Sequence, residues 1–316
     1  MHHIPLDRNI LETIITNKLP LSRNNYSLWD GDVLDLLSSI EKRQRFNLVV
    51  TSPPYNIGKD YEEKAEFKKY MEWQEAIIEL IIPMVYDEGS ICWQVGNYVQ
   101  NGEIWPLDYE IAPIFRRHGL KLRNRLVWHY GHGLHSRKRF SGRYEVVLWF
   151  TKTDNYKFNL DPVRIPSKYP SKKSYKGPRA GEYSSNPLGK NPEDVWPVED
   201  GIWDIPNVKS NHIEKTDHPA QFPVGLIEKL LLALTDSGDK LFDPFAGVST
   251  TGVAAALHGR KYLGSEIIPE YNNIGKIRID AALSGKPVHR PYDKPIYDHR
   301  QSSLSVIPNG FKGNVK

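Results

Sequence analysis

The chain has 316 residues, 39% of them apolar and 25% charged, which is enough to bury a sizeable core and excludes disordered, collagenous and coiled-coil chains. Its single cysteine, Cys92, excludes a disulfide scaffold and a zinc site built from several cysteines. The most apolar stretch, residues 77–86, is too short to span a membrane, and the N-terminus does not resemble a signal peptide, so we expect a soluble, cytoplasmic protein.

Positive charge is concentrated in two parts of the chain, although the net charge is only +4. Residues 111–144 hold nine Lys or Arg and no acid, and residues 162–181 hold six more, again without an acid. This segregation predicts a surface that binds a polyanion such as a nucleic acid. The first part also holds His129, His132 and His135, but neither Cys nor a carboxylate accompanies them there, so we expect no metal site.

From residue 26 onward, apolar runs typical of buried strands alternate with helical spacing, and this alternation predicts an α/β fold. The continuous apolar run 46–50 predicts a central parallel strand. In chain order, the other predicted elements are a helix over 66–85, a strand over 90–96, a helix over 107–118, strands over 125–129 and 146–150, a helix over 224–234, a strand ending at 243, a helix over 250–257 and a strand over 261–266. We expect a mostly parallel sheet with helices on both faces.

Five parts are expected along the chain. Residues 162–217 break the alternation, because they contain eight prolines and few aliphatic side chains, and we interpret them as a loop-rich insert outside the sheet. The insert separates residues 26–161 from residues 218–283, which form the two halves of one domain. Residues 1–25, with a short amphipathic helix, form an N-terminal extension, and residues 284–316 form a C-terminal tail.

Residues 240–252 predict a strand, a sharp turn and the start of a helix made of small residues. The backbone of such a turn can approach a ligand closely, and the helix N-terminus offers unpaired N–H groups. Glu266 ends the next predicted strand, 23 residues after Asp243, which is about where doubly wound folds place an acid that binds ribose hydroxyls. The turn contains no lysine, which argues against a phosphate-binding P-loop. The spacing therefore predicts a cofactor of the adenosine type.

A second candidate loop, Ser52-Pro53-Pro54-Tyr55, follows the first predicted strand. Because neither proline has an N–H, this loop offers mainly acceptors, namely the Ser52 hydroxyl oxygen and the Pro53 carbonyl. Acceptors can hold the hydrogens of an amino group that becomes a nucleophile, and the Tyr55 ring can stack on a base taken out of a duplex. The loop predicts chemistry on an amino group at the mouth of the sheet.

Three motifs together resemble the β-class of S-adenosylmethionine-dependent DNA amino-methyltransferases: Ser52–Tyr55, His218–Pro223 and the turn Asp243–Gly247, in that order. The resemblance covers about residues 26–280. It implies a Rossmann-like methyltransferase fold with circularly permuted motif order and a target-recognition insert between the catalytic and cofactor loops. It also implies transfer of a methyl group to the exocyclic amino group of a base flipped out of double-stranded DNA, as the modification enzyme of a restriction–modification system.

The resemblance also assigns roles to single positions. The catalytic residues that it implies are Ser52, Pro53, Pro54 and Tyr55. The residues that it implies for binding S-adenosylmethionine are Asp32, His218, Pro219, Ala220, Asp243, Pro244, Phe245, Ala246, Gly247, Ser249, Thr250 and Glu266. Among them, Glu266 would bind the ribose hydroxyls, Asp32 would lie beside the adenine amino group and Asp243 near the methionine part. The family often has glycine where Ser249 stands, so a slightly different turn is expected.

With DNA as the polyanion, the basic parts of the chain supply candidate contacts. These are Arg123, Arg125, His132, Arg137, Lys138, Arg139, Arg143, Lys168, Lys172, Lys173 and Lys176. Salt-dependent phosphate contacts are expected from the lysines, and the insert is the candidate reader of the recognition sequence. A restriction endonuclease that acts separately, a monomer or homodimer, and a place at the nucleoid of a bacterial or archaeal cell complete this expectation.

The target base stays open at this point. In the family, Ser at the position of Ser52 is more typical of enzymes acting on N4 of cytosine, and Asp is more typical of enzymes acting on N6 of adenine, so cytosine is favoured. Methylation of RNA or of a protein amide is an alternative, which the large basic insert and the motif order disfavour. An inactive nucleic-acid-binding module is another, which the intact Ser52, Tyr55, Asp243 and Glu266 disfavour. No covalent enzyme intermediate is expected, so Cys92 needs no chemical role.

Overall fold

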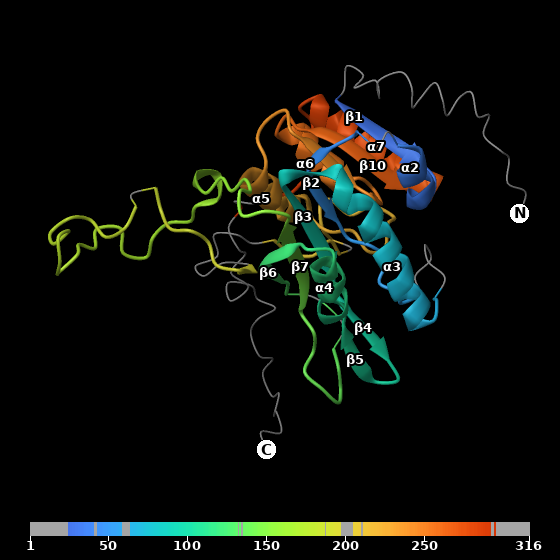
Figure 1. Cartoon of the computed structure of the whole chain (residues 1–316), viewed down its shortest axis with the longest axis horizontal. Helices are drawn as coiled ribbons and strands as arrows, with labels where there is room; N and C mark the ends of the chain where they lie inside the picture. Colours follow the sequence, from blue (N-terminus) through green and yellow to red (C-terminus); the bar gives the residue numbers. More distant parts are fainter. Residues whose placement is uncertain are drawn as a thin grey trace, which may run out of the picture.

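The computed structural model describes residues 25–40, 43–58, 64–131, 133, 135–186, 188–196, 205–209, 211–291 and 294. Its centre is an eight-stranded sheet (Figure 1). In spatial order the strands are β1 (Tyr26–Asp30), β10 (Lys261–Glu266), β9 (Lys240–Asp243), β2 (Phe46–Thr51), β3 (Val85–Val95), β7 (Tyr144–Thr151), β6 (Lys121–His129) and β8 (Val195–Trp196). All of these strands run parallel to β2 except β7, which is antiparallel to both of its neighbours.

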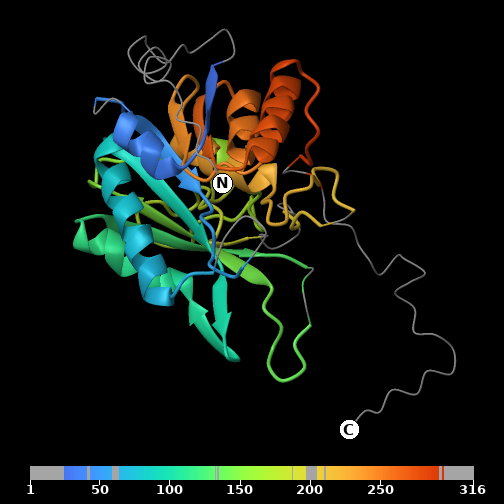
Figure 2. The same ribbon diagram turned by 90° about the vertical axis from the view of Figure 1, so that its right-hand side faces the viewer.

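Helices cover both faces of the sheet (Figures 1 and 2). On one face lie α2 (Val33–Ser39), α3 (Phe67–Ile81) and α4 (Leu107–Arg117), and on the other lie α5 (Val224–Leu234), α6 (Thr250–Leu257) and α7 (Pro269–Leu283). The central strand β2 packs into both layers: Leu48 and Val50 join the core beneath α5 and α6, and Phe46 and Val49 join the core beneath α3 and α4. Burial on both sides explains its continuously apolar sequence. The expected α/β fold is confirmed.

Most predicted elements occur within a few residues of their expected bounds, and the differences have local causes. The helix predicted over 66–85 ends at Ile81, because Pro83 lacks an N–H, and a 3₁₀ turn, η1 (Ile82–Met84), follows. The strand predicted over 90–96 is longer and begins at Val85. Neither α7 nor the hairpin of β4 (Asn97–Gln100) and β5 (Glu103–Pro106) was predicted from the sequence.

The loop-rich insert over 162–217 does not lie wholly outside the sheet, and this corrects the expectation. Its short strand β8 pairs with β6, Val195 opposite Val127 and Trp196 opposite Trp128, and so extends the sheet by one strand. Trp196 is buried there, which a segment that only loops over the surface would not achieve. Residues 166–186 do leave the body of the domain, and we call them the arm (Figure 1).

The two ends of the chain fall largely outside the described residues. The amphipathic helix predicted within residues 1–25 lies there, and so does most of the tail predicted over 284–316. Among the helices that the structure describes, none has both the length and the apolar character needed to cross a membrane.

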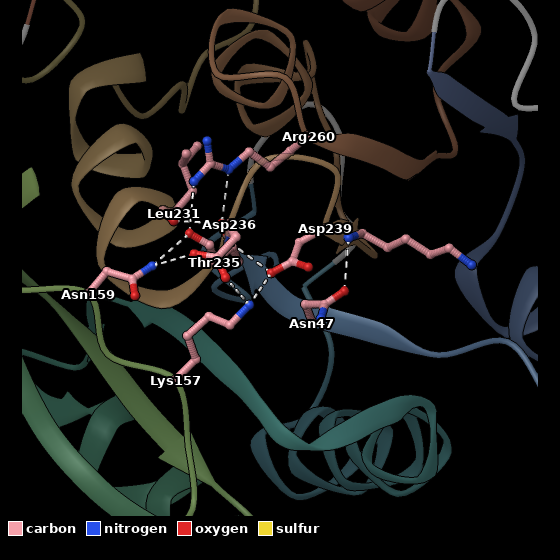
Figure 3. Close-up of polar contacts among 9 residues, drawn as sticks. Asn47, Lys157, Asn159, Leu231, Thr235, Asp236, Asp239 and Arg260 are labelled. Atoms are coloured by element: carbon pink, nitrogen blue, oxygen red, sulfur yellow. Dashed lines mark hydrogen bonds and ion pairs between the residues drawn. The ribbon is translucent and has the colours of Figure 1, made fainter.

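A group of polar contacts joins the two halves of the domain at the edge where the parallel strands begin (Figure 3). Lys157 Nζ, in the segment after β7, lies 2.6 Å from a carboxylate oxygen of Asp236 and 2.8 Å from one of Asp239. Nearby, Arg260 Nη2 donates to the carbonyl of Thr235 at 2.8 Å. These contacts fix the start of β9 beside the catalytic half, and the opposite edge, where ligands bind in open α/β sheets, is left for a site.

Candidate active site

A cavity of about 600 Å³ opens at the edge where β2, β3, β9 and β10 end. The loop 52–57 after β2 forms one wall, and the turn 244–248 after β9 forms another. Residues 31–33, 207–209 and 218–222 complete the lining together with side chains from α3, β3 and β7. The catalytic and cofactor motifs, which lie far apart in the sequence, therefore share one cleft.

The catalytic loop is held in place by hydrogen bonds on its outer side. Tyr70 of α3 donates its hydroxyl to the Pro54 carbonyl at 2.9 Å, and Gln74 Nε2 donates to the Tyr70 hydroxyl at 3.0 Å. Asn56, in a left-handed conformation with φ 59°, exchanges two hydrogen bonds with the backbone of Ala65 at 2.7 and 2.9 Å. The Pro54 carbonyl is thus occupied, and the acceptors of Ser52 and Pro53 remain on the cavity side.

Tyr55 closes the inner end of this loop. Its hydroxyl lies 3.0 Å from Ser52 Oγ, and its ring packs so tightly on Gly96 that a Cβ there would lie 2.9 Å from a ring carbon. A residue larger than glycine at position 96 would push the ring into the cavity. The phenol and the Ser52 hydroxyl therefore have a fixed relationship.

The cofactor turn presents backbone and a carboxylate to the cavity. Glu266 Oε2 accepts from the Gly247 N–H at 2.8 Å, and Oε1 accepts from the Ile268 N–H at 2.9 Å. Gly247 has φ 51°, a left-handed conformation that favours glycine, and a Cβ there would lie only 3.2 Å from His218 Nε2. Burial raises the pKa of Glu266, although these backbone N–H groups oppose the shift. The turn holds the Glu266 carboxyl in one orientation toward the cavity.

His218 and an aromatic wall flank the turn. Burial, with the positive charges of Lys215 and Arg278, lowers the pKa of His218 to about 4, so its ring is neutral at neutral pH. The Phe245 ring lies 5.3 Å from the Trp73 ring, centroid to centroid, and both line the cavity. Aromatic faces attract a cation, and a neutral imidazole does not repel one. This side of the cavity suits a ligand that carries a positive charge.

Comparison with known proteins agrees with this geometry. Residues 46–276 match the model of a family described as DNA methylase, N6/N4 type. This chain belongs to the N6/N4 DNA methylase family. It is 44% identical over 282 residues to the Type II methyltransferase M.BglII of Bacillus subtilis, an alignment that covers 89% of this chain and 75% of that protein. It is 32% identical over 259 residues to the DNA adenine methyltransferase YhdJ of Escherichia coli K12, with 80% and 82% covered.

A solved structure supports the fold of the methylase. The PvuII DNA methyltransferase, described as cytosine-N4-specific, superposes with a TM-score of 0.63 at 22% identity and covers 84% of this chain and 95% of its own. The cofactor of the methylase is S-adenosylmethionine. The residues present fit it: the bare backbone at Gly247 permits close approach, Glu266 offers carboxylate oxygens to hydroxyls, and Phe245 with Trp73 offers aromatic faces to a sulfonium.

Most of the predicted site residues line the cavity of the methylase. They are Asp32, Ser52, Pro53, Pro54, Tyr55, His218, Pro219, Ala220, Pro244, Phe245, Ala246, Gly247, Thr250 and Glu266. Asp32 also caps α2, since its Oδ1 accepts from the Leu34 N–H at 2.7 Å. Asp243 and Ser249 lie behind the wall: Asp243 is fully buried, and the Ser249 side chain points toward Gly275 of α7. These two support the turn instead of lining the cavity.

The predicted DNA contacts divide into two groups. Arg123 lies near the start of β6, at the edge opposite the cavity, where Nε donates to Thr151 Oγ1 at 2.7 Å and the guanidinium lies 4.4 Å from the centre of the Tyr156 ring. Arg123 therefore has a structural role in place of the DNA contact expected from the sequence. Arg125 forms an ion pair with the buried Asp108 at 2.5 Å, which ties β6 to α4.

The other predicted contacts that the structure describes stand on two projecting segments. Arg137, Lys138 and Arg139 are exposed, and Arg143 is half-buried, in the loop 131–143, which leaves β6 and returns to β7 at the cavity edge. The exposed lysines of the arm are Lys168, Lys172, Lys173 and Lys176. His132 lies outside the described residues.

The structure adds cavity residues that were not predicted from the sequence. Glu145 at the start of β7, Gln94 near the end of β3 and the segment 207–209 of the insert all line the cavity. Glu145 is an acid at the head of an otherwise apolar strand, which is a weak local signal, and Gln94 has none. Their role depends on strand pairing, which places both beside Tyr55.

Proposed function

We propose that the methylase transfers the methyl group of S-adenosylmethionine to the exocyclic amino group of a base flipped out of double-stranded DNA, with N4 of cytosine as the favoured target. One observation carries this proposal: the acceptor-lined loop at Ser52 and Pro53 and the cofactor turn at Phe245 to Gly247 border the same cavity. A methyl donor and an amino acceptor bound there would be neighbours.

The residues of the chain would act mainly by positioning. S-adenosylmethionine, when bound, supplies a methyl group attached to a positively charged sulfur. Ser52 Oγ and the Pro53 carbonyl accept the two N–H groups of the target amine and so direct its lone pair toward the cofactor side of the cavity. Tyr55 offers a ring face on which the flipped base stacks. Holding two reactants in this way can account for much of an enzyme's rate enhancement.

Two observations bear on the target base. Ser at the position of Ser52 is more typical of the enzymes of the resembling family that act on cytosine, which favours N4. The relatives carry names of both kinds, adenine for YhdJ and cytosine-N4 for the PvuII enzyme, so N6 of adenine is the second candidate.

Duplex DNA as the substrate is supported by the two projecting segments. The loop 131–143 carries Arg137, Lys138 and Arg139 and a fully exposed Phe140 at the cavity edge. Cationic side chains suit phosphates, and an apolar wedge suits the gap that a flipped base leaves. The arm carries four exposed lysines farther out, which suits a longer stretch of duplex, and we propose the insert as the reader of sequence.

The cellular role follows from the relatives. M.BglII is named a Type II methyltransferase, and we propose that this methylase likewise protects bacterial DNA within a restriction–modification system, beside an endonuclease that acts separately. It would then work as a monomer or homodimer in the cytoplasm, at the nucleoid.

The test is expression in a bacterial host that lacks DNA methylation, followed by sequencing that separates N4-methylcytosine from N6-methyladenine. We expect one modified base at one recurring sequence. Modified adenine would select the second candidate. Unmodified DNA, together with methylation of transfer RNA or protein by the purified enzyme, would overturn the proposal.

A further inference from the structure

Glu145 is the one carboxyl at the base side of the cavity among the residues that the structure describes, and the mechanism above does not use it. It stands at the start of β7, opposite Trp128 of β6, and its side chain points to the catalytic loop. Cofactor binding does not require it, since the cofactor turn lies on the other wall.

Three hydrogen bonds hold its carboxyl. Oε2 accepts from Gln94 Nε2 at 2.6 Å and from the Tyr55 hydroxyl at 3.3 Å, and Oε1 accepts from the Tyr130 hydroxyl at 3.4 Å. The charged groups that bear on this cluster are Lys209, whose charge favours the carboxylate, and Arg143, whose charge acts on Tyr130. The donors come from three different elements, so the carboxyl has a built site.

Tyr55 links this carboxyl to the catalytic loop, because its hydroxyl also lies 3.0 Å from Ser52 Oγ. If the Tyr55 proton points to Glu145, the Ser52 proton must point to Tyr55, and the lone pairs of Ser52 are left for the cavity. A carboxylate at position 145 selects this direction, since it can only accept. Without it, Tyr55 can donate to Ser52 and compete with the target amine.

We propose that Glu145 is a positioning residue and the terminal proton acceptor of the reaction, acting through Tyr55 to keep Ser52 an acceptor and to take up the proton that the target amine loses. This inference rests on the proposed function. It names a residue that neither the sequence motifs nor the relatives assign.

The proton transfer balances. The amine forms the new N–C bond with its lone pair and becomes positive, while the bond from the methyl carbon to its leaving group breaks and leaves its electron pair on that group. One N–H bond then breaks: its proton goes to Ser52 Oγ, the Ser52 proton goes to Tyr55, and the Tyr55 proton goes to Glu145 Oε2. Each hydroxyl gains one proton and loses one, and the carboxylate ends as a neutral acid. Burial raises the pKa of Glu145, which makes it a better proton acceptor than a carboxylate in water.

The experiment measures single-turnover methyl transfer as a function of pH for the wild type, Glu145→Gln and Tyr55→Phe. Glu228→Gln is the matched control, because Glu228 is a buried carboxyl of α5 that pairs with His258 outside the cavity. We expect Glu145→Gln to slow transfer by about 10²-fold, a typical effect of removing a proton acceptor, with binding of S-adenosylmethionine and DNA changed less than about two-fold. The wild-type rate should rise with pH through the raised pKa of Glu145, and this rise should be absent from Glu145→Gln and present in Glu228→Gln.

A second measurement is independent of activity. Carbon-13 NMR of glutamate-labelled enzyme should show one carboxyl that titrates above the ordinary glutamate pKa of about 4.3, absent from Glu145→Gln. Tyr55→Phe removes one donor to the carboxylate, so the pKa of this carboxyl should rise further. If Glu145→Gln does not fold, this titration and the Tyr55→Phe rate decide the question.

Three outcomes would overturn the inference: a rate unchanged in Glu145→Gln, weaker DNA binding with unchanged transfer, or no carboxyl with a raised pKa. A wild type that methylates no DNA would instead overturn the proposed function, and the titration would still report on Glu145.

Discussion

The hydroxyl of Thr51 donates a hydrogen bond of 2.6 Å to Oδ1 of Asp243, so the last residue of β2 is tied to the last residue of β9. Oδ2 of the same carboxyl accepts from Thr251 of α6 at 2.6 Å, and Oδ1 also accepts from the Phe245 N–H at 3.2 Å. Thr51 and Asp243 are both buried. The catalytic loop begins directly after Thr51 and the cofactor turn directly after Asp243, so this contact sets the spacing of the two walls.

Replacing Thr51 by valine should uncouple the two walls. Thr51→Val keeps the branched shape of the side chain but leaves an oxygen of the buried Asp243 without a donor, which typically costs about 1–3 kcal/mol. Urea unfolding measures this cost, and single-turnover kinetics should show slower transfer. Thr51→Ser keeps the hydroxyl and is the control. Equal stability of the valine variant and the wild type would contradict the role given to this bond.

Asp243 should also make stability depend on pH. Burial raises the pKa of Asp243 from 3.8 to about 6 in the folded protein. Between these two values the folded chain keeps a proton that the unfolded chain has released, so the free energy of unfolding should fall as pH rises through this window and level off above it.

Thermal unfolding of the wild type and Asp243→Asn across this window isolates the contribution, because other buried acids such as Glu214 and Glu266 are common to both. The stability of the wild type relative to the variant should decrease toward pH 6. A difference in Tm that stays constant with pH would show that Asp243 titrates normally.

Local signals predicted the elements that hold the two motif loops. The apolar run of β2 and the small residues of α6 indicated the right positions, because their neighbours in sequence decide them. The joint presence of Ser52–Tyr55 and Asp243–Gly247 was enough to place both loops at one cleft. No residue nearby in sequence indicates that Thr51 and Asp243 form a hydrogen bond, because that contact depends on which strands are neighbours in the sheet.

Contacts across the sheet account for the site residues that could not be predicted. Glu145 reaches Tyr55 only because β7 runs antiparallel beside β3, and one sequence does not reveal that pairing. Arg123 was misassigned for the same reason: the count of positive charges does not say at which edge of the sheet a strand begins. β8 was missed because two residues give no periodicity.

Ser52→Ala should lower turnover more than it weakens cofactor binding. The hydroxyl accepts an N–H of the target amine in the proposed function, whereas the cofactor turn lies on the other wall of the cavity. Calorimetry with S-adenosylmethionine and single-turnover kinetics with duplex DNA give the two quantities. We expect a Kd for the cofactor within about two-fold of the wild type and transfer slower by about 10²-fold. Equal decreases in both would place Ser52 in the cofactor site.

The glycine of α7 at position 275 should be required because of Ser249. Ser249 has φ 54° at the start of α6, a left-handed conformation that glycine adopts more easily, which explains why the resembling family often has glycine there. A Cβ on Gly275 would lie 2.4 Å from Ser249 Oγ and 2.9 Å from its Cβ. We expect Gly275→Ala to cost about 1–3 kcal/mol through overpacking.

Ser249→Gly should restore part of this stability, because it removes both atoms and relieves the left-handed strain. A double-mutant cycle followed by urea unfolding measures the coupling, and Lys276→Ala, an exposed position of the same helix, is the control. Additive effects of the two substitutions would mean that Ser249 and Gly275 do not constrain each other.

The lysines of the arm should contribute salt-dependent affinity for DNA. Lys168, Lys172, Lys173 and Lys176 are exposed on a segment that leaves the body of the domain, and none of them forms an ion pair with an acid in the described part of the chain. Each phosphate that the protein no longer neutralises should reduce the slope of log K against log salt concentration by about 0.9, so replacing all four lysines by glutamine should reduce it by up to about 4. Titration of duplex DNA at several salt concentrations gives the slope.

Lys276→Gln with Lys286→Gln is the matched control, since both lysines are exposed on or just after α7. An unchanged slope in the arm variant would mean that the arm does not touch phosphates. The variant also separates positioning from reading: if the lysines contact only phosphates, affinity for specific and non-specific duplexes should fall by the same factor. A larger fall for the specific duplex would mean that the arm also reads bases, because phosphate contacts alone carry no sequence information.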